Sequence, residues 1–123
     1  MIIILKEEIL ANLKIAVLTL ARMKVSDIVV LDLRGICSFT DYFVIGSAAS
    51  TRQVKSVCDE INDALKGEKV LPLHIEGYPE GNWVILDYCD FVIHIFFEDT
   101  RNYYNIERLW GDAQRIQFQE IAD

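Results

Sequence analysis

WVILDYCDFVIHIFFEDTRNYYNIERLWGDA, residues 83–113, is the stretch of this 123-residue chain that decides the fold. Two apolar runs rich in β-branched and aromatic residues, 83–88 and 91–96, are separated only by Cys89 and Asp90. Two residues are the length of a tight hairpin loop, so the runs are predicted to pair as antiparallel strands.

A helix is predicted directly after this hairpin. Asp99 or Thr100 offers a side-chain oxygen that can cap the free amides of the first turn. The residues that seat the helix on the core recur at helical spacing: Tyr103, Ile106, Leu109, Trp110 and Ala113. The side chains that fall off this stripe, and are therefore expected in solvent, are Arg101, Tyr104, Glu107 and Arg108. A large exposed ring among charges predicts a partner surface around Tyr104.

The chain before the hairpin predicts two helices and three strands. Residues 6–23 form an amphipathic helix whose buried face is Ile9, Leu13, Ala16, Val17 and Leu20. Strands follow at 27–33 and 41–45, and their short link makes them antiparallel. Gly46 to Ala49 is predicted as a turn, and Ser50-x-x-Gln53 as a capping box for a helix that ends near Gly67.

That second helix buries Val54, Val57, Cys58, Ile61 and Leu65. A third strand at 70–75 would complete a right-handed parallel crossover, and 76–82 is a loop leading to the hairpin. The sequence therefore predicts an α/β fold with a mixed, about five-stranded sheet covered by helices. The length and a hydrophobic fraction of 52% fit a single domain over residues 1–123.

The composition limits the classes of partner and location. No run approaches the ~20 apolar residues of a membrane helix, and Lys6, Glu7 and Glu8 follow the short apolar start, so a soluble cytoplasmic protein is expected. Three cysteines without a C-x-x-C pair predict reduced thiols. The net charge of −7 disfavours a phosphate backbone as ligand. Residues 87–112 hold six acids and two bases, a net −4, which either steers a basic partner or is a solvated face.

The sequence lacks the usual signatures of nucleotide, hydrolase and metalloprotease sites, so we predict a protein without catalytic activity, cofactor or metal. His74, Glu76 and His94 could conceivably form a metal site, although such ligands are usually spaced more tightly. Cys89 beside Asp87 and His94 has the residue types of a thiol nucleophile with its base, but a hairpin turn offers no evident oxyanion hole.

A sharper enzyme alternative comes from Gly46-Ser47, placed after a strand and before a helix as in nucleotidyltransferase-fold enzymes acting on a nucleotide or an RNA end. Those enzymes hold two metal ions with an acid pair on the following strand. Here that strand carries Glu76 without a second acid two residues away. We therefore expect a nucleotidyltransferase-like fold without the catalysis.

Four motifs together resemble the ribosomal silencing factor family, also called Iojap-like proteins. They occur in the family's order and spacing over nearly the whole chain: Asp41-Tyr42-Phe43-Val44-Ile45; Ser50-Thr51-Arg52-Gln53-Val54-Lys55; Trp83-x-x-Leu86-Asp87-Tyr88-x-Asp90-x-Val92-x-His94-x-Phe96; and Tyr104-x-x-Glu107-x-Leu109-Trp110-x-Asp112-Ala113. One departure is Cys89, where glycine is expected in the hairpin loop. Cysteine tolerates positive φ poorly, which leaves the turn type open.

The resemblance implies a protein that binds the large ribosomal subunit through ribosomal protein uL14, a small β-barrel protein with a basic surface. Occupying that face would block association with the small subunit and repress translation under nutrient limitation. The expected contacts are Trp83, Asp87, Tyr88, Asp90, His94, Tyr104 and Glu107. Leu109 and Trp110 share the motif but fall on the packing stripe, so they are assigned to the core. Family members form homodimers when free, and the sequence leaves the oligomeric state here open.

Overall fold

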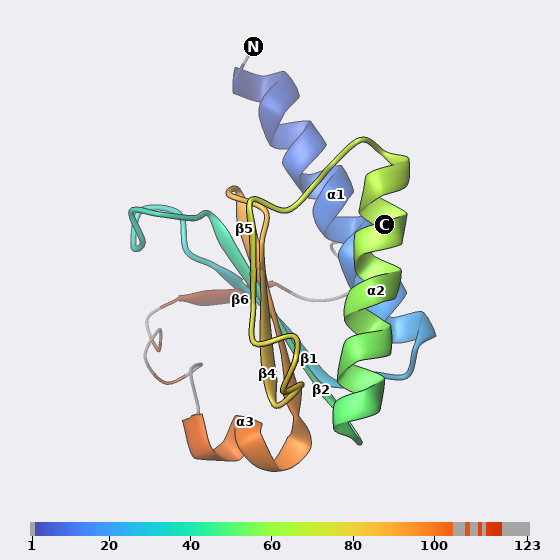
Figure 1. The fold of residues 1–123 in the computed structure, drawn as a ribbon. Helices are drawn as coiled ribbons and strands as arrows, with labels where there is room; N and C mark the ends of the chain where they lie inside the picture. The colour runs from blue at the N-terminus through green and yellow to red at the C-terminus, as the bar shows by residue number, and fades with distance from the viewer. Residues whose placement is uncertain (1, 105–107, 109–110, 112, 117–123) are drawn as a thin grey trace.

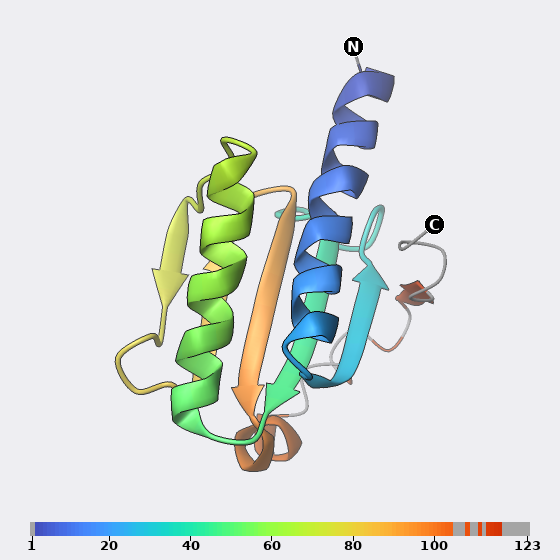
Figure 2. The ribbon, with the colours of Figure 1, turned by 90° about the vertical axis from the view of Figure 1, so that its right-hand side faces the viewer.

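The protein was analysed as a computed structural model, which describes residues 2–104, 108, 111 and 113–116; the side chains of 2–6 and 102–104 lie outside the description. One mixed sheet of six strands in the order β3-β4-β5-β2-β1-β6 forms the centre. Two long helices, α1 (Ile2–Arg22) and α2 (Thr51–Gly67), lie side by side on one face of this sheet (Figures 1 and 2).

The predicted hairpin is confirmed as β4 (Trp83–Asp87) and β5 (Phe91–Phe97), paired antiparallel. The Tyr88 amide donates to the Phe91 carbonyl at 3.0 Å, which closes the loop. Inside it, the Asp90 amide donates to the Tyr88 carbonyl at 2.9 Å, and Cys89 takes a φ of 75°. A bond across a single residue at this φ is a γ-turn, a strained conformation for any side chain other than glycine.

The central pair of strands is β5 and β2 (Tyr42–Ala48), which run parallel from Tyr42 opposite Phe91 to Ala48 opposite Phe97. The prediction that the chain turns at Gly46 is therefore wrong. The strand continues because neighbours on both sides extend its pairing, and all seven of its residues are buried. β1 (Ser26–Asp32) pairs antiparallel on the other side of β2, as predicted.

The third strand departs from the prediction. β3 covers only His74–Glu76 at the edge of the sheet, where it pairs antiparallel with β4. It runs in the same direction as β2 and is reached through α2 by a right-handed crossover (Figure 2), but the hairpin lies between the two strands. At the opposite edge, β6 (Gln114–Ile116) pairs with β1, so the described sheet has six strands instead of about five.

The two long helices bury the stripes that their spacing predicts. In α2 the buried residues are Val54, Val57, Cys58, Ile61 and Leu65, and in α1 they are Leu13, Ala16, Val17 and Leu20, with Ile9 partly buried beside them. The Ser50 hydroxyl accepts from the Gln53 amide at 3.1 Å, which confirms the cap. The Gln53 side chain accepts from the Ala49 amide at 2.8 Å instead of from Ser50, so the capping box is displaced by one residue.

The third helix starts earlier than predicted. α3 (Glu98–Tyr104) follows β5 without an intervening residue, so Asp99 and Thr100 lie inside its first turn and not at its cap. Of the stripe predicted for this helix, Ala113 lies outside α3 and is half-buried, and the Tyr103 side chain, Ile106, Leu109 and Trp110 lie outside the description. The solvent position expected for Arg101 is wrong, because Arg101 is 7% exposed.

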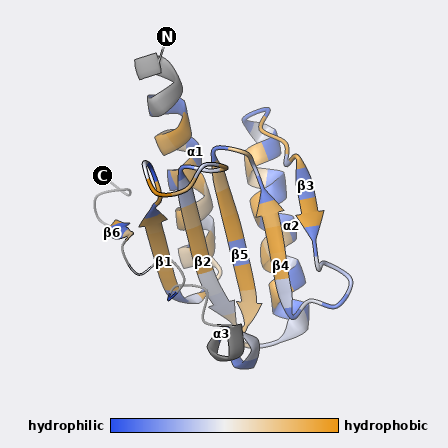
Figure 3. Ribbon diagram, turned by 90° about the vertical axis from the view of Figure 1, so that its left-hand side faces the viewer, coloured by the Kyte–Doolittle hydropathy of each residue, from blue (hydrophilic) through white to orange (hydrophobic). Residues whose placement is uncertain are grey.

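The sheet has an apolar cluster on each face. The larger cluster lies under α1 and α2 and includes Val84 and Leu86 of β4. The smaller one lies on the opposite face, which Figure 3 shows with the helices behind the strands; its buried members are Leu31, Leu33, Phe43, Ile45, Val92 and Phe96. Trp83 and Ile85 pack against this second cluster, because successive residues of a strand point to opposite faces.

Candidate partner-binding surface

Five aromatic rings form a continuous row across the face opposite the long helices. The Phe39 ring lies 6.2 Å from Phe43, and Phe43 meets the His94 ring edge-on at 4.4 Å. His94 is followed by Trp83 at 6.0 Å, and Trp83 stacks on Phe96 at 5.0 Å. These spacings are those of favourable aromatic pairs. The row, which we call the aromatic row, therefore fixes the rings in place and ends in Phe39, which is 62% exposed.

Trp83 and His94 are joined by a hydrogen bond that fixes the histidine's protonation. The Trp83 Nε1–H donates to His94 Nδ1 at 3.1 Å, so a neutral imidazole carries its proton on Nε2. Burial lowers the pKa of His94 to about 3, which keeps the ring neutral. Its buried Nε2 has no hydrogen-bond partner within the described residues. His94 is therefore a buried member of the sheet that is held by a hydrogen bond.

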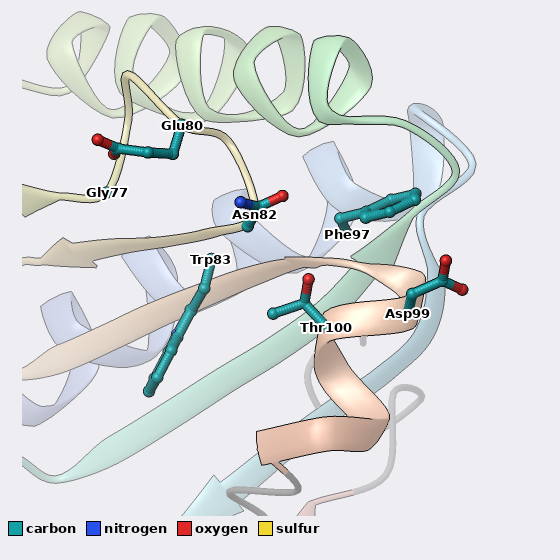
Figure 4. A pocket seen from close by; sticks show the side chains of 7 residues that line it. All are labelled: Gly77, Glu80, Asn82, Trp83, Phe97, Asp99 and Thr100. Atoms are coloured by element: carbon teal, nitrogen blue, oxygen red, sulfur yellow. The ribbon is translucent and has the colours of Figure 1, made fainter.

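A pocket of about 560 Å³ opens beside Trp83 at one end of the aromatic row. Figure 4 shows Glu80 and Asn82 of the loop before β4 on one side and Asp99 and Thr100 of α3 on the other. The loop is shaped by Gly77, whose φ is 79° and where a Cβ would lie 2.1 Å from the Trp83 carbonyl oxygen. Only glycine fits there, so the chain can pass close to Trp83.

Acidic side chains lie at both ends of the aromatic row. At the hairpin turn, Asp87 accepts from the Cys89 amide at 2.8 Å, and the backbones of Asp41 and Asp90 are hydrogen-bonded at 3.1 Å. Partial burial, with the nearby Asp41 carboxylate, raises the pKa of Asp90. At the α3 end the acids are Glu80, Glu98 and Asp99, all exposed. Carboxylates around an apolar centre complement a basic surface.

The structure brings together only part of the predicted contact set. Trp83 and His94 are joined on the aromatic row, with Asp87 half-buried and Asp90 exposed at its turn end. Tyr88 lies in the cluster under the long helices, where it is 6% exposed and stacks on Phe91 at 5.2 Å. Its ring is therefore a packing element and not a surface anchor.

Tyr104 and Glu107 complete the predicted contact set. Tyr104 is the last residue of α3, while its side chain and all of Glu107 lie outside the description. His94 is itself buried behind its neighbouring rings, at 5% exposure. The role of these residues as contacts stays a prediction.

Arg101 is the site residue that the sequence did not reveal. Its Nη1 donates to the Asp27 carbonyl at 2.5 Å and to the Ser47 hydroxyl at 2.9 Å. Helical spacing could not predict these two hydrogen bonds, because an arginine side chain is long enough to reach back to the end of a strand. The one sequence signal is the Gly46-Ser47 pair, which resembles the entry motif of nucleotidyltransferase-fold enzymes.

The described residues of the enzyme alternatives make other contacts or lie apart from one another. The Ser47 hydroxyl is occupied by Arg101, and Gly46 is small because a Cβ there would lie 2.5 Å from the Val25 side chain. The side chains of His74 and Glu76 are hydrogen-bonded to each other, and no group of three metal-ligating side chains occurs among the described residues. His94 lies opposite Ile85 on the neighbouring strand, several residues from Cys89 in the turn.

Fold and surface together define a two-layer α/β protein that carries an aromatic face bordered by acids. The chain belongs to the ribosomal silencing factor family: residues 6–123 match the family model described as "Ribosomal silencing factor during starvation". The ribosomal silencing factor of Bacillus subtilis is 41% identical over 101 residues, which cover 82% of this chain and 86% of the relative.

Two further relatives extend the comparison. A mouse protein named for mitochondrial assembly of the ribosomal large subunit is 34% identical over 87 residues, 68% of this chain and 38% of the mouse protein. A crystal structure of a Chromobacterium violaceum protein superposes with a TM-score of 0.79 at 34% identity and covers 87% of this chain and 88% of that one. Within the described ranges, no helix has the length and apolar character needed to cross a membrane.

Proposed function

We propose that this protein binds the large ribosomal subunit through uL14, blocks its association with the small subunit and so represses translation under nutrient limitation. Membership of the ribosomal silencing factor family carries the proposal. The name of the mouse relative, which refers to assembly of the ribosomal large subunit, supports that subunit as the partner. The function requires no cofactor, and it places the protein in the cytoplasm with the ribosomes.

The contact surface in this proposal is the aromatic row with its acidic ends. Trp83 and Phe39 provide apolar area, because Trp83 is half-buried and Phe39 is mostly exposed. Asp87 and Asp90 at the hairpin turn set the orientation of a basic partner. Tyr104 and Glu107 belong to the same proposal as further contacts. The same apolar face would also support a homodimer of the free protein, since exposed apolar patches favour association.

Occupation of Ser47 by Arg101 favours this binding role over nucleotidyl transfer. A nucleotide would have to displace a buried guanidinium to reach the serine, which would break the hydrogen bond from that charge to the Ser47 hydroxyl. Incubation with labelled nucleoside triphosphates, magnesium and RNA acceptors should give no labelled product. Turnover that Ser47→Ala abolishes would refute the binding role.

The decisive experiment measures subunit joining. Large and small ribosomal subunits from Bacillus subtilis are mixed with the protein and separated on a gradient, and binding to purified uL14 is titrated in parallel. The parent should keep the subunits apart and bind uL14 more weakly as salt rises, because charges at an exposed rim are screened within ~8 Å at physiological ionic strength.

The Asp87→Lys, Asp90→Lys variant should lose both effects. The matched control is Glu60→Lys, Asp63→Lys, which makes the same charge change on exposed residues of α2, on the other face of the sheet. Control and parent should behave alike. If the hairpin variant still separates the subunits at parental concentration, the acidic turn is not at the interface; if the parent does not bind large subunits, the proposed function is wrong.

A further inference from the structure

Arg101 connects α3 to the neighbouring ends of β1 and β2. Of the four α3 residues whose side chains are described, it is the one that is buried; Glu98 and Asp99 are exposed and Thr100 is half-buried. Helices of seven residues are not stable by themselves, so the orientation of α3 depends on its tertiary contacts. The other side-chain hydrogen bond described for α3 is a long one, from the Ser26 hydroxyl to Glu98 at 3.4 Å on the surface.

The backbone of β1 is shaped to receive this arginine. The pairing of β1 with β2 shifts register between Ser26 and Val29, and Asp27 inside that bulge has a φ of 51°. Bulges redirect backbone groups, and a positive φ at a residue with a side chain persists only where surrounding contacts enforce it. The carbonyl freed from the ladder at Asp27 is the one that accepts from Arg101 Nη1.

The second acceptor comes from the end of β2. The Ser47 side chain is 3% exposed, so its hydroxyl cannot meet any partner of the protein directly. Its backbone carbonyl accepts from the Ser26 hydroxyl at 3.2 Å, which ties it to the same bulge. The ends of β1 and β2 thus present two oxygens to one guanidinium, a charge-assisted arrangement that holds α3 in one place.

We infer that Arg101 is a positioning residue for the partner-binding surface. By holding α3, it fixes Asp99 and Thr100, which form one side of the pocket beside Trp83, and it sets the start of the segment that leads to Tyr104. Ser47, from the Gly46-Ser47 pair that resembles the entry motif of nucleotidyltransferase-fold enzymes, serves this internal contact. The inference rests on the proposed function, because it assigns Arg101 to the surface that meets the ribosome.

A double-mutant cycle between Arg101 and Ser47 tests the inference. The affinity for large ribosomal subunits from Bacillus subtilis is measured for the parent, Arg101→Met, Ser47→Ala and the double variant. Arg101→Met should bind about tenfold or more weakly, because apparent affinity falls with the fraction of molecules whose α3 is docked. Ser47→Ala should weaken binding in the same direction by a smaller factor, and the double variant should be no more than about twofold weaker than Arg101→Met.

Hydrogen exchange over residues 98–104 gives a readout independent of the ribosome. Exchange should rise at least about tenfold in Arg101→Met while β2 and β5 stay protected, because only α3 is released. Arg52→Met, which removes an exposed arginine of α2, is the matched control and should change neither exchange nor affinity. Asp27→Gly, which keeps the carbonyl and suits the positive φ, should also bind as the parent does.

Direct contact of Arg101 with the ribosome predicts a different pattern. Ser47→Ala would then leave affinity unchanged, and exchange in α3 would not respond to Arg101→Met; either result overturns the inference. If Arg101→Met does not fold, Arg101→Lys, which keeps the charge and reaches fewer acceptors, takes its place in both measurements. A parent that fails to bind large subunits refutes the proposed function, while exchange in α3 still decides whether Arg101 holds that helix.

Discussion

Lowering the pH from 7 to 5 should destabilise this protein by about 2 kcal/mol through His94 alone. Burial lowers the pKa of His94 from 6.5 to about 3. The unfolded chain binds a proton on this side chain below pH 6.5, whereas the folded chain stays neutral until about pH 3. Unfolding therefore takes up a proton in that window, and stability falls as the pH falls. The drop from pH 7 to pH 5 includes about one and a half pH units below 6.5. Each of these units lowers the free energy of unfolding by ~1.4 kcal/mol.

The assay is urea unfolding of the parent, His94→Gln and His74→Gln at pH 7 and pH 5. His94→Gln keeps an oxygen that can accept from Trp83 but does not titrate, so it should lose most of the pH dependence. His74 is the protein's other histidine and is exposed, so His74→Gln should keep that dependence. The raised pKa of Asp90 acts in the opposite sense, but only at the lower pH where carboxylates titrate.

Nuclear magnetic resonance of the imidazole nitrogens tests the cause directly. His94 should remain the Nε2–H tautomer at pH 5, because Trp83 donates to Nδ1. The reasoning is refuted if the His94 ring titrates near pH 6.5 in the folded protein, or if the parent is equally stable at both pH values.

Three further substitutions test the local geometry by urea unfolding. Cys89→Gly should stabilise the protein by about 1 kcal/mol, since glycine adopts the φ of 75° in the hairpin turn without strain; an unchanged or lower stability would contradict the γ-turn. Gly77→Ala should destabilise it by about 2 kcal/mol or more, because the added Cβ would lie 2.1 Å from the Trp83 carbonyl oxygen, and a neutral effect would show that the loop is not close to β4. Ser50→Ala should cost about 1 kcal/mol by removing the cap that the Gln53 amide donates to, and parental stability would mean that another group caps α2.

For α2 and the hairpin, whose structure depends on short-range spacing, the sequence was sufficient. The five buried residues of α2, the cap at Ser50 and the hairpin around Cys89 and Asp90 all follow from periods of 3.6 and 2.0 residues and from local capping chemistry. The family could also be recognised from its motifs, because the order and spacing of side chains can be compared without knowledge of the fold.

Long-range pairing was beyond what the sequence could decide. Gly46 and Ser47 read as a turn because glycine usually interrupts a strand, yet β2 continues to Ala48 since β5 pairs along its whole length. β3 has only three residues and lies at the edge of the sheet, because β4 and β5 of the hairpin lie between it and β2. These outcomes depend on which strands meet, and no local pattern contains that information.

For the candidate surface, too, the sequence predicted one part of the arrangement and the tertiary structure decided the rest. The sequence placed Trp83, His94 and the hairpin acids in one segment, but it predicted Trp83 and Tyr88 alike as contacts, although the two residues lie on different faces of the sheet. Only the tertiary structure showed that the Trp83 indole holds His94, that Tyr88 packs under the helices and that Arg101 turns inward. The physical reason is that a side chain's role at such a site depends on partners from distant strands. Asp27 and Ser47 lie 74 and 54 residues before Arg101, and folding alone brings them together.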